Sequence, residues 1–251
     1  MKETRLIMGM PITLEIVGDS TSTAPKDMGN IFDYFTYVDK TFSVYKDSSE
    51  IMRINRGELS IEASSQDVRE IFALSEKTKE ESDGYFNIVN RKGILDPSGI
   101  VKGWAIRNAA DLLKKSGYEN FYVEAGGDIQ AHGSNALGKP WSVGIKNPFN
   151  QKEIVKVLYP GNKGVATSGT YIRGQHIYDP KKMAEDITDI VSLTVVGPNV
   201  YEADRFVTPA FAMGKKGIEF IETLRGFEGY MIDADAVATM TSGFKKYETN
   251  R

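Results

Sequence analysis

The chain has 251 residues, of which 41% are hydrophobic and 26% charged, and this composition is typical of a globular protein that buries a core. Its net charge of −3 excludes the overall basic field of a nucleic-acid-binding protein, so we expect no nucleic-acid partner. The lack of cysteine excludes disulfides and thiolate sites, and two histidines are too few for a histidine-built zinc site. A metal would therefore be held by oxygen, as Mg²⁺ and Ca²⁺ are.

The first predicted element is a strand at residues 12–17, where apolar and polar residues alternate. Apolar residues at helical spacing then predict helices at 26–41, 65–82 and 103–116. Strand patterns follow at 121–124, 141–145, 155–158 and 191–196. The last predicted elements are helices at 199–213 and 217–224 and a strand at 230–232.

Helices and strands mix in this order without the steady strand–helix–strand rhythm of a parallel sheet. We therefore predict an α+β fold with largely antiparallel sheets and packed helices, forming a single domain over residues 1–251. No segment is apolar and long enough to span a membrane, and the first residues lack the apolar core of a signal peptide. We expect a cytoplasmic protein or, alternatively, an exported protein whose leader has been removed.

Residues 95–105 combine a turn rich in Pro, Ser and Gly with the start of a helix. Small residues let a ligand approach the backbone, the N–H groups at a helix start attract anions, and Lys102 adds a positive charge. This segment is suited to hold a phosphate group. A capped helix with a surface lysine is the alternative interpretation, because short turns of this kind before helices are common.

A pair of glycines, Gly126 and Gly127, lies between a predicted strand and Asp128. Paired glycines permit a bulge or a close approach between backbone and ligand. Asp128 is a candidate to orient a ribose or another substrate group. A plain tight turn explains the same residues equally well.

Hydroxyl and charged side chains are concentrated in residues 165–180, where the candidates are Thr167, Ser168, Arg173, His176 and Asp179. Arginine binds pairs of phosphate oxygens, and histidine carries protons near neutral pH. The segment is therefore a candidate for phosphate binding and proton transfer. The alternative is a polar hairpin that turns at Asp179 and the proline after it.

Asp204 and Thr208 are four residues apart in a predicted helix, so their oxygen atoms lie on one helix face. A carboxylate with a hydroxyl suits a hard cation that keeps water and substrate phosphate among its ligands. Alternatively, Thr208 bonds back to the helix backbone and Asp204 is solvated. Pro209 lacks an N–H and clashes with the carbonyl of Arg205, so we expect a kink or an irregular turn there.

Taken together, the order of these motifs resembles the ApbE family, the FAD:protein FMN transferases, over nearly the whole chain. The Ala-Thr-Ser-Gly and His-x-x-Asp-Pro segments are the most specific parts of the resemblance. The matching segments are Met8-Gly9, Asp39, Phe42-Ser43-Val44-Tyr45, Ser49-Glu50-Ile51, Asn55, Gly84-Tyr85-Phe86, Lys102, Gly126-Gly127-Asp128-Ile129, Trp141, Gly144-Ile145, Pro148, Ala166-Thr167-Ser168-Gly169, Tyr171, Arg173, His176, Asp179-Pro180, Ala203-Asp204 and Thr208.

The resemblance implies an FAD cleft between two lobes, formed by the segments around Met8, Tyr45, Lys102, Gly127 and Thr167. Met8 and Tyr45 fall where the family holds the flavin nucleotide, and Lys102 falls where its pattern meets the diphosphate.

The resemblance also implies a magnesium site made of the Asp204 and Thr208 side chains and the Gly99 carbonyl. His176 matches a histidine that the family ties to catalysis.

Two positions depart from the family pattern. Asn87 stands where the family usually has Asp, which exchanges an anionic acceptor for a neutral amide at a nucleotide-binding position. Pro209 replaces a small helix former beside the metal position. In addition, residues 234–239 copy the pattern of the metal helix at a different place in the chain. We interpret Asp233 and Asp235 there as turn residues before a last strand.

The implied reaction begins when a Thr or Ser hydroxyl of an acceptor protein, within a flavinylation motif, attacks the FMN phosphorus of FAD. AMP leaves, FMN stays attached through a phosphoester, and His176 or Asp179 removes the hydroxyl proton. Lys102 and Mg²⁺ offset charge on the leaving phosphate. The alternatives are an FAD diphosphatase, in which water replaces the acceptor, and an FAD-binding protein without turnover.

Overall fold

The computed structural model describes residues 1–18, 23–170, 177–182 and 185–248. The helices are α1 (Ala24–Phe42), α2 (Glu50–Asn55), α3 (Gln66–Glu81), α4 (Ser98–Lys115), α6 (Val200–Ala212) and α7 (Gly217–Thr223), with 3₁₀ turns η1 (Gly214–Lys216) and η2 (Phe244–Tyr247). The strands are β1 (Lys2–Ile7), β2 (Met10–Ile16), β3 (Phe121–Ala125), β4 (Asp128–His132), β5 (Val143–Asn147), β6 (Asn150–Leu158), β7 (Gly164–Gly169), β8 (Tyr178–Asp179), β9 (Glu185–Asp186), β10 (Ile190–Gly197), β11 (Glu228–Asp233) and β12 (Ala238–Met240).

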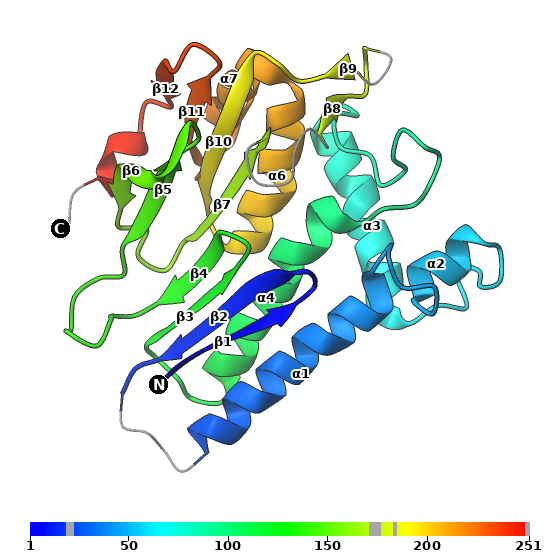
Figure 1. The fold of residues 1–251 in the computed structure, drawn as a ribbon, viewed down its shortest axis with the longest axis horizontal. Helices are drawn as coiled ribbons and strands as arrows, with labels where there is room; N and C mark the ends of the chain where they lie inside the picture. The colour runs from blue at the N-terminus through cyan, green and yellow to red at the C-terminus, as the bar shows by residue number, and fades with distance from the viewer. Residues whose placement is uncertain (19–22, 171–176, 183–184, 249–251) are drawn as a thin grey trace.

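An eight-stranded sheet in the order β1-β2-β3-β4-β7-β10-β11-β12 forms the centre of the fold (Figure 1). Each of its seven strand pairs is antiparallel, and β5–β6 and β8–β9 form two separate hairpins. The prediction of an α+β fold with largely antiparallel sheets is confirmed. No helix in the described ranges is long and apolar enough to cross a lipid bilayer.

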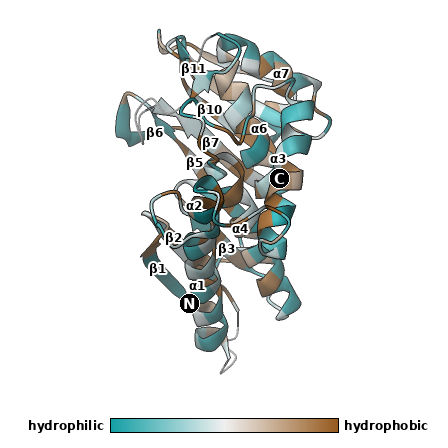
Figure 2. Ribbon diagram, turned by 90° about the vertical axis from the view of Figure 1, so that its right-hand side faces the viewer, coloured by the Kyte–Doolittle hydropathy of each residue, from teal (hydrophilic) through white to brown (hydrophobic). Residues whose placement is uncertain are grey.

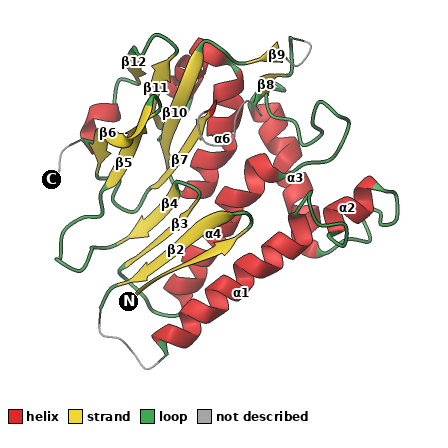
Figure 3. Cartoon of the chain, in the orientation of Figure 1, coloured by secondary structure: helices red, strands yellow, loops and turns green. Residues whose placement is uncertain are grey.

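The helices lie together on one side of the sheet, as the view coloured by secondary structure shows (Figure 3). One core packs α1, α3 and α4 against β2 and β3. A second core packs α6 and α7 against β7, β10 and β11. The opposite side of β7, β10 and β11 is covered by β5, β6 and η2, which form a third core. Hydrophobic segments run along the helices and strands of this interior in the side view (Figure 2).

The sheet separates between β4 and β7, where the two halves of the molecule meet. The ladder between these strands contains the pairs Ile129↔Val165 and Gln130↔Gly164. At the next position the Asp128 carboxylate takes the place of a backbone acceptor, because its Oδ1 accepts the N–H of Thr167 at 3.0 Å. The separation leaves polar groups of β4 and β7 facing α4 and α6.

Four segments differ between the prediction and the structure. α4 begins at Ser98 instead of residue 103, because the Asp96 carboxylate accepts the Ser98 N–H (3.1 Å) and stabilises the first turn. The segments 128–132 and 164–169, which we interpreted as turn and hairpin motifs, are the strands β4 and β7. α6 continues through Pro209 to Ala212, which corrects the irregular turn expected there.

Candidate active site

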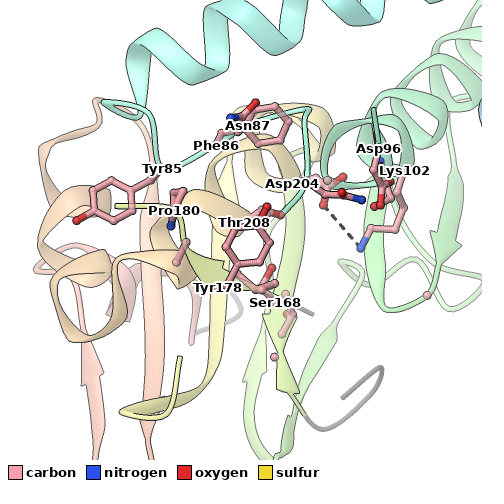
Figure 4. Close-up of a pocket in the computed structure, with 18 residues that line it drawn as sticks. Tyr85, Phe86, Asn87, Asp96, Lys102, Ser168, Tyr178, Pro180, Asp204 and Thr208 are labelled. Carbon is pink, nitrogen blue, oxygen red and sulfur yellow. Dashed lines mark hydrogen bonds and ion pairs between the residues drawn. The ribbon is translucent and has the colours of Figure 1, made fainter. Parts of the chain in front are cut away.

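Two neighbouring cavities meet at the start of α4, and both are lined by Asp96, Ser98 and Lys102. The α6 cavity, of about 160 Å³, is bounded by α6, β7 and the segments 85–90 and 177–180 (Figure 4). The hairpin cavity, of about 420 Å³, lies beside the turn between β1 and β2 and is also lined by residues 38–46. Because Lys102 borders both cavities, a ligand that fills both would pass this ammonium group.

Lys102 lies between two buried carboxylates at this junction. Its Nζ is 2.7 Å from Asp128 Oδ2 and 3.6 Å from Asp204 Oδ1. Asp128 is fully buried, and the Asp204 side chain is 4% exposed. Figure 4 shows Lys102 and Asp204 pointing toward each other across the cavity wall. The arrangement combines one positive and two negative groups where little solvent screens them.

Burial raises the pKa of Asp204 to about 7; the nearby Lys102 ammonium opposes this shift, and the Asp128 carboxylate adds to it. The second oxygen of Asp204 is fixed by the backbone, because Oδ2 accepts the N–H of Gly103 at 2.7 Å. In a regular helix the Gly103 N–H points at the Gly99 carbonyl. Asp204 thus accepts from an N–H that a regular helix also directs at that carbonyl.

Gly103 allows α4 and α6 to come this close, and Gly99 lies one turn away beside Thr208. A Cβ on Gly103 would lie 2.5 Å from the Cβ of Asp204, a distance that real side chains do not adopt. A Cβ on Gly99 would lie 3.9 Å from the Thr208 hydroxyl oxygen. The contact therefore brings the Gly99 backbone, the Asp204 carboxylate and the Thr208 hydroxyl to the wall of one cavity.

These three groups fit the chemistry of a magnesium site. They offer a carbonyl, a carboxylate and a hydroxyl, and Mg²⁺ prefers such oxygen ligands. In the described part of the chain, no group of three or more His, Cys, Asp or Glu side chains could hold a metal alone. A cation here would therefore share its coordination with water and substrate oxygens, as Mg²⁺ does in phosphate sites.

Met8 and Tyr45, the residues expected to hold the flavin nucleotide, both line the hairpin cavity. Met8 and Gly9 form the two-residue loop between β1 and β2, with φ values of 57° and 70°. Such loops favour glycine, so Met8 occupies a backbone conformation that is unusual for its type. Tyr45 is 93% exposed, and its ring has little contact with the core.

The candidates from the glycine and hydroxyl motifs occupy different places around the site. Gly126, and not Gly127, lines the α6 cavity, while the Gly127 N–H donates to Glu124. Thr167 and Ser168 both line the cavity. The Thr167 hydroxyl, however, is 2.9 Å from that of Thr194, so this side chain is already hydrogen-bonded within the sheet.

His176 and Arg173, the expected catalytic histidine and a candidate phosphate ligand, lie outside the described residues. Asp179, the other candidate base, is buried next to the α6 cavity, whose lining includes Tyr178 and Pro180. Its Oδ1 accepts the Lys181 N–H at 2.8 Å, and Oδ2 is 3.5 Å from Lys182 Nζ. These contacts stabilise the turn that follows β8.

Asn87 lines the α6 cavity, where its Oδ1 also accepts the Val89 N–H at 2.9 Å. Its neighbours Tyr85 and Phe86 line the same cavity. Two ion pairs join this segment to residues 178–186 on the opposite side: Arg91 with Asp186 at 3.0 Å and Lys181 with Asp83. The two walls of the cavity are therefore connected at its rim.

Sequence reasoning did not select several cavity residues, among them Tyr85, Asn90, Asp96 and Tyr178. Tyr85 was part of the Gly-Tyr-Phe motif, and Asp96 and Tyr178 lie in the segments 95–105 and 165–180, but none of the three was a named candidate. The repeated pattern at 234–239 is a turn, as expected: Asp233 Oδ1 accepts the N–H groups of Asp235 and Val237, and β12 follows.

Comparison with known proteins connects this geometry to a family. The ApbE family model matches residues 8–92 and 89–231. Curated FAD:protein FMN transferases from Vibrio cholerae and Haemophilus influenzae are each 32% identical, over 62% and 61% of this chain. These alignments include 48% of each relative, so the chain spans about half the length of the curated relatives it matches.

Solved structures show the same fold. The flavin transferase ApbE from Vibrio cholerae aligns with a TM-score of 0.86 over 98% of both chains, at 24% identity. The ApbE protein from Thermotoga maritima aligns with a TM-score of 0.87 over 99% of both chains, at 19% identity. At these identities the alignments support the fold and leave the activity to be argued from the site.

Proposed function

The chain belongs to the ApbE family, and on this premise we propose that it is a Mg²⁺-dependent transferase that moves FMN from FAD to a Thr or Ser hydroxyl of an acceptor protein. The curated relatives from Vibrio cholerae and Haemophilus influenzae carry the name FAD:protein FMN transferase. The observation that supports the proposal most strongly is that two cavities meet at Lys102, beside Asp204 and Thr208. A dinucleotide has two large ends joined by a diphosphate, and this arrangement offers a place for each part.

In this proposal the hairpin cavity and the α6 cavity each take one end of FAD, and Lys102 binds diphosphate oxygens from the junction. Asp204, Thr208 and the Gly99 carbonyl would hold Mg²⁺, which supplies further positive charge to the diphosphate. Oδ2 of Asp204 is fixed by the Gly103 N–H, so Oδ1, which lies 3.6 Å from Lys102, is the oxygen that would bind the cation. Such fixed charges stabilise the phosphate oxygens without reorganisation during the reaction.

The transfer step breaks the bond between the FMN phosphorus and the oxygen that bridges the two phosphorus atoms of FAD. The acceptor hydroxyl oxygen forms the new phosphoester bond, AMP takes the bridging oxygen, and the hydroxyl proton passes to a base. His176 is the proposed base, because Asp179 is occupied by the turn after β8. Positioning and electrostatics supply most of the acceleration in such phosphoryl transfers.

The test is to incubate the protein with FAD and Mg²⁺, with and without an acceptor domain that carries a flavinylation motif, and to quantify AMP and FMN by chromatography. The proposal predicts AMP release that requires acceptor and produces no free FMN. Equal amounts of AMP and free FMN without acceptor would show a diphosphatase instead. Intact FAD under both conditions would show a binding protein without turnover.

A further inference from the structure

Asp128 connects three elements of the fold, β4, β7 and α4. It begins β4, its Oδ1 accepts the Thr167 N–H of β7 at 3.0 Å, and its Oδ2 lies 2.7 Å from Lys102 of α4. The side chain is completely buried. A fully buried carboxylate makes no direct contact with a ligand in the cavity, so Asp128 acts on the site through Lys102, which it pairs with, and through its negative charge near Asp204.

The Lys102 ammonium has two described carboxylates within reach, and the two distances differ. The ion pair with Asp128 has an N···O distance of 2.7 Å, whereas the distance to Asp204 is 3.6 Å. Attraction between unit charges increases as their separation falls, so Asp128 holds this ammonium more strongly. Without the negative charge on Asp128, the nearest described anion for Lys102 would be Asp204.

An ammonium paired with Asp204 would compete with a cation for the same carboxylate. We propose that Asp128 is a positioning residue that keeps the Lys102 ammonium off Asp204 and so leaves that carboxylate available to a divalent cation. This inference rests on the proposed function, because it takes Asp204 as a metal ligand. It adds a residue that contacts neither metal nor substrate, and it explains why a lysine can lie beside a metal site without displacing the metal.

The first variant that tests this role is Asp128→Asn. Asparagine keeps the shape and the oxygen that accepts the Thr167 N–H, and it removes the charge that holds Lys102. Binding of Mg²⁺ alone to the purified full chain is measured by isothermal titration calorimetry at pH 8. We expect at least about a tenfold loss of affinity, a loss typical when an outer contact of a metal site is removed.

Asp128→Asn is also measured in a Lys102→Met protein. This comparison separates an effect on Mg²⁺ binding that acts through Lys102 from a direct effect of losing the Asp128 charge. In Lys102→Met there is no ammonium to compete, so Asp128→Asn is expected to change Mg²⁺ affinity by less than about threefold. The double variant also has the same net charge as the wild type, and we expect its affinity to lie within about threefold of the wild type. An equal loss from Asp128→Asn in both backgrounds would overturn the inference.

Asp233→Asn is the matched control. Asp233 is also a buried carboxylate paired with a lysine, with Oδ2 2.8 Å from Lys215 Nζ, but it lies outside both cavities. Its variant should bind Mg²⁺ as the wild type does. If Asp128→Asn alone does not melt cooperatively, the double variant, which removes the two opposite charges of the Asp128–Lys102 pair together, carries the test: a tenfold loss there overturns the inference.

The outcome for the inference can be told apart from the outcome for the metal site itself. A wild type that binds Mg²⁺, an Asp204→Ala variant that does not, and an Asp128→Asn variant with wild-type affinity would overturn only the role of Asp128. A wild type that binds no Mg²⁺ would overturn the metal site and this inference together.

Discussion

The burial of Asp204 carries an electrostatic cost. Its carboxylate is buried between α4 and α6, where it accepts one backbone N–H and faces one lysine. Burial without a full set of partners disfavours the charged form. The folded protein without metal therefore holds a proton on this group at pH values where an exposed aspartate has lost it.

This burial gives a pH dependence of known sign. With a folded-state pKa of about 7 and an ordinary unfolded value near 4, the folded state binds the extra proton between these pH values. Stability therefore falls as pH rises through this window, because unfolding releases that proton. Asp204→Asn lacks the effect. We expect the free energy of unfolding of the variant, relative to the wild type, to increase from pH 4 to pH 7 in urea denaturation with chelator.

Parallel pH profiles for the two proteins would contradict the buried, uncharged state of Asp204. The same samples with Mg²⁺ provide a second readout. Since ligands that bind the folded state stabilise it, Mg²⁺ should raise the melting temperature of the wild type and leave that of Asp204→Asn unchanged.

Tyr45, in contrast to the buried Asp204, is 93% exposed at the edge of the hairpin cavity. We expect Tyr45→Ala to leave the melting temperature unchanged, since almost no core contact is lost. Loss of a ring that packs on the flavin nucleotide should weaken FAD binding by about 1 kcal/mol, roughly fivefold, as measured by fluorescence titration. Leu137→Ala, at a position that is 79% exposed and outside both cavities, is the control. Equal FAD affinity in both variants would exclude Tyr45 from the binding site.

The contact between α4 and α6 sets the geometry of the site, and it depends on small residues in α4. The sequence of residues 97–99 predicts a loop, because Pro, Ser and Gly have low helix propensity in the interior of a helix. In the structure they form the N-terminal cap and first turn of α4, where these residues are tolerated. Local propensity could not show that the contact with α6 requires glycine at 103.

Two helix glycines should respond to alanine in opposite directions. Gly103→Ala places a Cβ 2.5 Å from the Asp204 Cβ and 2.9 Å from the Val200 carbonyl oxygen, so we expect a loss of about 1–3 kcal/mol in stability. Gly29 in α1 has no heavy atom within 4 Å of its added Cβ. Gly29→Ala should stabilise the protein by about 0.4–1 kcal/mol. Urea denaturation measures both, and a shift in the same direction for the two variants would contradict the close helix contact.

The elements whose apolar residues repeat at a clear helical spacing were predictable from sequence. The helix predicted at 65–82 is α3, and the one at 199–213 is α6, in which the spacing of Asp204 and Thr208 does place both residues in one cavity. β4 and β7 were missed because their glycines and polar residues are typical of turns. Their polar side chains are tolerated inside the sheet because partners such as Lys102 satisfy them.

In the molecule as a whole, the site depends on contacts between segments far apart in the sequence. Lys102 meets Asp128 and Asp204 only because the sheet separates between β4 and β7 while α4 and α6 pack together. Nothing in the spacing of Asp128 along the chain indicates that it is buried beside a lysine. The motif order selected candidate residues for the site, and the fold was needed to show which of them contact one another.

The most direct test of the proposed activity is the mass of an acceptor domain after incubation with FAD, Mg²⁺ and either wild type or Asp204→Asn. We expect the wild type to add one FMN to a Thr or Ser of the acceptor, and Asp204→Asn or added chelator to abolish the addition. An acceptor that gains FMN equally with wild type and Asp204→Asn would contradict the proposed metal site. An acceptor that gains no FMN with the wild type would contradict the transferase function itself.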